Sequence, residues 1–251
     1  MVKKRIIPIQ LFYHGRLIKT KKFLSARDVG DPVSSSRVYS DQDADELIIV
    51  NVEALGELDQ KFVDTIERIS EVCFVPLSVG GGVKSLKDAE KLFNSGADKI
   101  IINNAFLTNH GIATEIANHF GSQSVVISLD FRCVNDKYCL FKNRGIEEVA
   151  EEPIEIIKRA IDSGAGELFI QSIDHDGTMQ GYDLNLLKFI SGISTIPVII
   201  AGGCGKFTDI KHAFEVGASA VACGSLFNFG DNNPLRAKSY LKNYNFELKV
   251  I

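Results

Sequence analysis

One carboxylate stands out because it ends an otherwise apolar segment. Asp130 closes the run Val125-Val-Ile-Ser-Leu-Asp130, which has the length and β-branched content of a buried strand. Burial at the end of a strand raises the pKa of a carboxyl group toward neutrality, where it can release or accept a proton. Asp130 is therefore a candidate general acid or base. The alternative is a carboxylate that only orients a loop.

A glycine-rich turn occurs twice, each time between an apolar run and a helical pattern. The first copy is Gly80-Gly-Gly82 and the second is Gly202-Gly203. Backbone N–H groups in such turns can approach an anion closely, and the start of a helix adds favourable partial charge. Two copies predict two phosphate sites that face each other across one centre. Glycines at these positions can also serve only as tight turns.

Both turns belong to a longer duplication of the chain. The offset is constant, 202 − 81 = 121, for the identical pairs Gly81 and Gly202, Asp88 and Asp209, Phe93 and Phe214, Gly96 and Gly217, and Phe106 and Phe227. A constant offset without a gap indicates two homologous halves.

The elements that would position these groups alternate along the chain. Apolar runs of strand length are separated by helical patterns eight times, at residues 5–11, 46–52, 75–80, 98–104, 124–130, 167–173, 196–201 and 219–224. Eight such units predict an α/β fold with a closed parallel sheet, and 251 residues is the usual size of a (β/α)8 TIM barrel. We therefore expect a single barrel domain, residues 1–251, built from two homologous half-barrels.

Further candidates lie near the carboxyl ends of the strands, where the functional groups of such barrels gather. Lys19 precedes a polar segment, residues 20–32, that is expected to form a mobile flap; Lys19 could reach a phosphate or remain a solvated surface lysine. The string Asp174-His-Asp-Gly-Thr178 has carboxylates at a metal-like spacing, but it is also typical of a turn. Contact of Asp176 or the Gly177 amide with substrate is favoured over a metal site.

Four charged residues each begin a predicted strand at the opposite end of the barrel: Arg5, Glu46, Lys99 and Glu167. Two cations and two anions would converge there. The simplest interpretation is an ion-paired plug that serves stability.

Composition excludes several classes of function. The net charge of −4, without a basic cluster, argues against nucleic-acid binding. The five cysteines form no CxxC pair, which favours reduced thiols in the cytoplasm and no zinc site. Apolar runs are too short to span a membrane, and no signal peptide is evident. No metal and no cofactor are expected.

Several strings together resemble one family, the cyclase subunit of imidazole glycerol phosphate synthase from histidine biosynthesis. They are Lys4-Arg-Ile-Ile7, Gly30-Asp-Pro32, Asp45-Glu-Leu47, Val79-Gly-Gly-Gly82, Gly96-Ala-Asp-Lys99, Gly121-Ser-Gln-Ser-Val-Val126, Gly164-Ala-Gly-Glu167, Ser172-Ile-Asp-His-Asp-Gly-Thr178 and Gly181-Tyr-Asp183. The similarity runs nearly from end to end.

The resemblance implies a lyase-type barrel that receives ammonia from a glutaminase subunit and uses it on a substrate with two phosphates. The family's ammonia gate matches Arg5, Glu46, Lys99 and Glu167, and its partner-contacting aspartate matches Asp98. One phosphate site matches Gly82, Asn103 and Asn104; the other matches Gly177, Gly203, Gly224 and Ser225. Lys19 matches a flap lysine, and Asp130 matches one of two catalytic aspartates.

The chain departs from the family mainly at the predicted top of the barrel. Leu11 stands where the family has its other catalytic aspartate, Asn51 replaces an aspartate, and Arg144 replaces a small residue. Leucine cannot transfer a proton, so ring closure is expected to be weakened or altered. Two alternatives follow: a paralogue that amidates a surface sugar, and a barrel that only activates a glutaminase. An isomerase of the same superfamily fits these strings less well.

Overall fold

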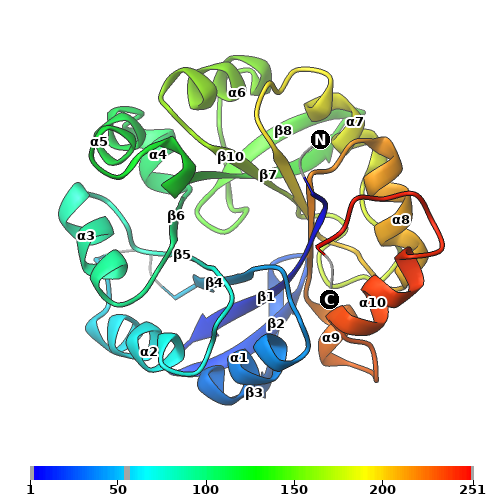
Figure 1. Cartoon of the computed structure of the whole chain (residues 1–251). Helices are drawn as coiled ribbons and strands as arrows, with labels where there is room; N and C mark the ends of the chain where they lie inside the picture. The colour runs from blue at the N-terminus through cyan, green and yellow to red at the C-terminus, as the bar shows by residue number, and fades with distance from the viewer. Residues whose placement is uncertain (1–2, 54–56, 250–251) are drawn as a thin grey trace.

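A closed barrel of eight parallel strands forms the centre of the computed structural model, which describes residues 3–53 and 57–249 (Figure 1). Each strand pairs in parallel with the next one around the barrel, and β10 pairs with β7 to complete the ring. The barrel strands are β1 (Arg5–Tyr13), β4 (Leu47–Asn51), β5 (Leu77–Gly80), β6 (Lys99–Ile102), β7 (Val125–Val134), β10 (Glu167–Ser172), β11 (Val198–Ala201) and β12 (Ala220–Cys223). The fold is therefore the predicted (β/α)8 barrel.

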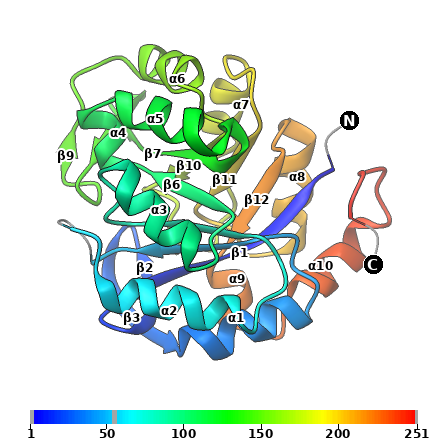
Figure 2. The same ribbon diagram turned by 60° about the vertical axis from the view of Figure 1, so that its left-hand side comes forward.

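Helices cover the outside of the barrel (Figures 1 and 2). The longer ones are α1 (Pro32–Asp41), α2 (Gln60–Ser70), α3 (Leu86–Asn94), α5 (Gly111–Phe120), α6 (Pro153–Asp162), α7 (Leu184–Ser191), α8 (Phe207–Val216) and α10 (Pro234–Leu241); α4 (Asn104–Thr108), α9 (Ser225–Asn228) and a 3-10 turn (Ser122–Ser124) are short. Their starts follow local chemistry: the Ser85 hydroxyl caps α3, and Pro153 opens α6 at its first position.

The duplication seen in the sequence is also present in the structure. The strands β5 and β6 of the first half have the same bounds as β11 and β12 after a shift of 121 positions, because 198 − 77 and 220 − 99 give the same number. Gly81 and Gly202, one in each half, both have positive φ, 102° and 96°. The two halves thus share backbone conformation as well as residue types.

Residues 20–32 do not form the predicted polar loop. They contribute to an antiparallel hairpin of β2 (Arg16–Lys21) and β3 (Leu24–Gly30), which extends β1. Lys22 and Phe23 make its tight turn with φ of 55° and 62°. Such a turn usually contains Asn-Gly or Asp-Gly, so the sequence carries no ordinary signal for it. A matching extension, β8 (Lys137–Lys142) and β9 (Glu147–Glu148), follows β7 and was not predicted either.

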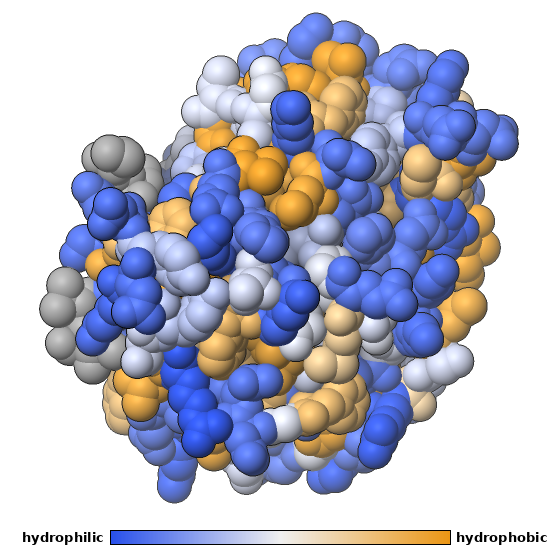
Figure 3. Space-filling model, turned by 90° about the vertical axis from the view of Figure 1, so that its right-hand side faces the viewer, coloured by the Kyte–Doolittle hydropathy of each residue, from blue (hydrophilic) through white to orange (hydrophobic). Residues whose placement is uncertain are grey.

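Apolar side chains form two layers. The larger layer lies between sheet and helices, and the smaller one fills the barrel with Ile7, Ile9, Ile48, Ile101, Val126, Phe169, Ile199, Ala201, Ala220 and Ala222. The outer surface is different: Figure 3 shows polar and charged side chains over most of one face, with apolar side chains in small groups. Among the described helices, none has the length and apolar character needed to cross a membrane.

Candidate functional site

A cavity of about 540 Å³ opens at the carboxyl ends of the barrel strands. Strand ends from both halves and the β2–β3 hairpin contribute to its wall. The predicted residues that line it are Lys19, Gly82, Asn103, Asn104, Asp130, Asp176, Gly177, Gly203, Gly224 and Ser225. The structure therefore brings every predicted substrate and proton-transfer residue to one cavity.

Asp130 is a buried carboxylate without a cationic partner among the described residues. The side-chain amide of Asn103 donates to one carboxylate oxygen at 3.0 Å, and that of Gln171 donates to the other at 3.1 Å. Burial raises the pKa of Asp130 to about 7; the two amide donors oppose this rise, and the charge of Asp176 adds to it. The group can therefore exchange its proton near neutral pH, which suits general acid–base catalysis.

The cavity wall also contains apolar side chains. Leu11 and Val50 pack against the small core inside the barrel and also line the cavity. Asn51 lines it as well, 3% exposed, and its side-chain nitrogen makes no hydrogen bond to the described residues. Asp130 and Asp176 are therefore the carboxylates that line the described part of the cavity.

The first-half site, defined as Gly82, Asn103 and Asn104, depends on close backbone packing. At the neighbouring Gly81, an added Cβ would lie 2.2 Å from the Asn51 carbonyl oxygen, and φ is 102°. A side chain there would both clash and strain the backbone. Asn104 is held by Asn143: its amide donates to the Asn143 side chain at 3.2 Å, and its side-chain oxygen accepts the Asn143 N–H at 3.0 Å.

The second-half site, defined as Gly177, Gly203, Gly224 and Ser225, has a buried lysine beside it. Lys19 is 7% exposed, its ammonium donates to the Ile9 carbonyl, and a Cβ added to Gly224 would lie 2.8 Å from its Nζ. Burial lowers the pKa of Lys19 to about 8, against the opposing charge of Asp176. Lys19 lies on β2, so it reaches the cavity from a strand rather than from the predicted flap.

Asp176 ties the β2–β3 hairpin to the second half. Its carboxylate accepts from the Thr20 hydroxyl at 2.8 Å and from the Phe23 N–H at 3.1 Å. Burial raises the pKa of Asp176, although these donors and the charge of Lys19 oppose the rise. This carboxylate therefore positions the hairpin that carries Lys19.

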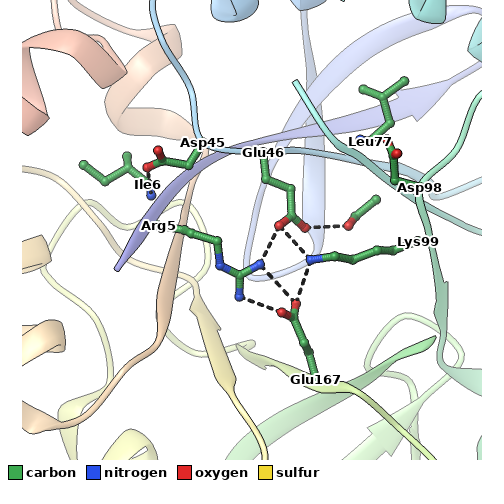
Figure 4. Close-up of polar contacts among 9 residues, drawn as sticks. Arg5, Ile6, Asp45, Glu46, Leu77, Asp98, Lys99 and Glu167 are labelled. Atoms are coloured by element: carbon green, nitrogen blue, oxygen red, sulfur yellow. Dashed lines mark hydrogen bonds and ion pairs between the residues drawn. The ribbon is translucent and has the colours of Figure 1, made fainter. Parts of the chain in front are cut away.

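At the opposite end of the barrel, Arg5, Glu46, Lys99 and Glu167 form one ion-paired cluster, the charged ring (Figure 4). Arg5 bridges Glu46 at 2.5 Å and Glu167 at 2.8 Å, and Lys99 bridges the same two carboxylates at 2.9 and 3.2 Å. Burial alone would raise the pKa of Glu46, but Lys99 and Arg5 lower it overall. The predicted convergence of these four residues is confirmed.

Asp98 lies beside the charged ring. Its carboxylate accepts the Leu77 N–H at 2.8 Å, and the residue remains exposed (Figure 4). It is therefore accessible at the end of the barrel that carries the ring. The apolar interior described above separates this end from Asp130, with Phe169, Ala220 and Ala222 among its residues.

Sequence reasoning missed part of this arrangement. No role was predicted for Gln171, whereas its side-chain amide donates a hydrogen bond to Asp130. The clamp between Asn104 and Asn143 was also missed, because it joins residues far apart in the chain. The duplication is the one sequence feature that could have indicated the clamp, because it places a hairpin after the first strand of each half.

Comparisons with known proteins agree with this geometry. A family model described as histidine biosynthesis protein matches residues 5–233. The imidazole glycerol phosphate synthase subunit HisF of Exiguobacterium sibiricum is 38% identical over 242 residues, covering 96% of this chain and 97% of that protein. The subunits of the same name from Bacillus cereus and Hyphomonas neptunium are 38% and 40% identical, over 100% and 96% of this chain and of their own lengths. The chain thus belongs to the histidine biosynthesis protein family, and within it to the HisF-type subunits of imidazole glycerol phosphate synthase.

Proposed function

We propose that this protein is an ammonia-dependent cyclase subunit that acts with a glutaminase subunit on a histidine-pathway ribonucleotide carrying two phosphates. The observation that carries the proposal is Asp130, a buried carboxylate with a pKa of about 7 between two glycine turns. Since the five cysteines of the chain are all free, we expect the reaction to take place in the reducing cytoplasm.

In this proposal the two phosphates of the substrate occupy the first-half and second-half sites. Backbone N–H groups at Gly82 and Gly203 would bind them, and Lys19 would add a positive charge at the second-half site. Fixing both ends holds the reacting centre over Asp130. Because Asp130 exchanges its proton near neutrality, it can accept a proton from ammonia as it attacks and return a proton during ring closure.

Ammonia would enter through the charged ring. The glutaminase subunit docks on that end and contacts Asp98 in this proposal. Neutral ammonia would then pass the apolar interior, which includes small residues such as Ala220 and Ala222, whereas an ammonium ion would lose its hydration there. The ring must open for this passage, since its four side chains are paired in the structure.

Leu11 is expected to weaken ring closure. It lines the cavity where the family has a second carboxylate, and loss of a general acid or base costs about 10² to 10⁴ in rate. In this proposal, Leu11 lowers the rate of ring closure but does not change the substrate. The relatives named above all carry the synthase name, which supports this function over sugar amidation or a purely activating role.

The experiment is ammonium-supported formation of imidazole glycerol phosphate from the ribonucleotide. We expect slow turnover by the natural protein, an increase of about tenfold or more in Leu11→Asp, and no such increase in the uncharged control Leu11→Asn. If Leu11→Asp instead lowers turnover, another group has taken over this proton transfer. No turnover by either protein would contradict the cyclase function.

A further inference from the structure

A hairpin follows the first strand of each half, and the two hairpins correspond in sequence position and in backbone conformation. The turn residues Lys22 and Phe23 have φ of 55° and 62°; Asn143 and Arg144, 121 positions later, have φ of 53° and 59°. The strand before each turn also matches, since β2 begins at Arg16 and β8 at Lys137. In Figure 1, β2 and β8 lie on opposite sides of the barrel, but the turns approach each other, since a Cβ added to Gly145 would lie 3.4 Å from the Phe23 side chain.

Each hairpin contacts the proposed phosphate site of the other half. The β2–β3 hairpin belongs to the first half and brings Lys19 to Gly224 of the second half. The β8–β9 hairpin belongs to the second half, and Asn143 binds Asn104 of the first half through two hydrogen bonds. The arrangement is therefore crossed: each half delivers a hairpin to the site of the other.

Arg144 stands next to this clamp with a free guanidinium. It is exposed and lines the same cavity as Gly82, Asn103 and Asn104. The nearby acidic groups have other partners: Glu147 pairs with Lys142 at 2.7 Å, and Asp174 lies 3.8 Å from Arg132. Among the described residues, nothing forms an ion pair with Arg144.

The backbone at Arg144 is also held in an unfavourable conformation. Asn143 and Arg144 are consecutive residues other than glycine with positive φ, and Gly145 follows with φ of 78°. Such conformations persist where neighbouring contacts fix them, and here the bonds to Asn104 do so. The clamp therefore holds the backbone that carries Arg144 at the cavity.

We infer that Arg144 is a phosphate-binding residue of the first-half site, where it supplies the positive charge that Lys19 supplies at the second-half site. This inference rests on the proposed function. A guanidinium binds a phosphate through two parallel N–H donors, which a single lysine ammonium cannot reproduce. The substrate class it favours is one with a fully ionised phosphate monoester at this end.

The test uses inorganic phosphate and the complete isotope-labelled protein, with the backbone amide signals of Gly82 and Gly224 followed by NMR. Each signal reports the dissociation constant at its own site. We expect Arg144→Asn to raise the constant at Gly82 by about fivefold and to leave that at Gly224 unchanged. Asparagine tolerates positive φ, so the turn is retained. Arg144→Lys should recover part of the binding.

Two control variants sharpen the result. Lys137→Gln removes the same charge from an exposed position of the same hairpin outside the cavity wall, and should change neither constant. Lys84→Gln removes another exposed cation that lines the cavity near Gly82, and should weaken binding by less than about twofold, because an ammonium cannot make the two parallel N–H bonds of a guanidinium. An unchanged constant at Gly82 in Arg144→Asn, or a larger effect of either control, would overturn the assignment. Absence of saturable binding at both glycines would instead overturn the proposed phosphate chemistry itself.

Discussion

Each end of the barrel contains a buried carboxylate, but the pKa values of the two carboxylates are shifted in opposite directions. At one end, Glu46 is 1% exposed but lies between Arg5 and Lys99, and its pKa is lowered. At the other end, Asp130 is 5% exposed, receives only neutral amide donors, and has its pKa raised to about 7. Burial is similar, so the partners determine the protonation state.

This difference separates two tasks within one fold. The ion pairs with Lys99 and Arg5 favour the ionised form of Glu46, which suits a structural role at this end. An amide-bound carboxylate changes its protonation near neutrality, which suits proton transfer. The predictions below test each end in turn, from the largest expected effect to the smallest.

The largest effect is expected at the top of the barrel. Asp130→Asn keeps the shape of the side chain but removes the proton acceptor, so ammonium-supported turnover should fall by about 10² to 10⁴. The matched control is Asp174→Asn, because Asp174 follows a barrel strand outside the cavity wall. Equal losses in the two variants would show that Asp130 has no special part in the reaction.

At the bottom, the expected effect is on stability. Lys99→Met leaves two carboxylates with Arg5 as their remaining cation, and breaking a buried ion pair costs about 3 to 5 kcal/mol. Denaturant unfolding should show this loss, whereas the exposed Lys91→Met should change the unfolding free energy by less than about 0.5 kcal/mol. Adding Glu46→Gln to Lys99→Met should recover part of the loss. A free energy unchanged by Lys99→Met would contradict the role given to the ring.

The dependence of stability on pH compares the two ends directly. The folded pKa of Asp130 lies above its ordinary value of 3.8, so the stability that Asp130 contributes is lost as pH rises from about 4 through 7. Asp130→Asn has no titrating group at this position and does not lose stability in this way as pH rises. Its unfolding free energy relative to wild type should therefore increase by about 2 to 4 kcal/mol between pH 4 and pH 8. Parallel stability profiles would show that Asp130 titrates normally.

The charged ring should give the reverse slope. The pKa of Glu46 is lowered, so the stability it contributes is present above its unfolded pKa and is lost as pH falls through the folded one. Compared with Glu46→Gln, the wild type should lose additional stability on acidification below about pH 5. The same unfolding series measures this smaller effect at its acidic end.

Much of this arrangement could be predicted from the sequence, because it repeats. The ungapped offset between Gly81 and Gly202 predicts two half-barrels. Because the strands are parallel, Asp130 near a strand end and Arg5 at a strand start are expected at opposite ends of the barrel. The β2–β3 hairpin was not predicted, since its turn uses Lys22 and Phe23 at positive φ. The amide environment of Asp130 was also beyond sequence reasoning, because Asn103 and Gln171 approach it from neighbouring strands.

The most direct test of the account is the titration of the Asp130 carboxyl carbon by NMR, with Asp130→Asn used to assign the signal. A carboxylate that transfers protons in the reaction, buried and bound only by amides, should titrate with a pKa near 7. A pKa near 4, the value of an ordinary solvated aspartate, would contradict the contrast between the two ends and the role proposed for Asp130.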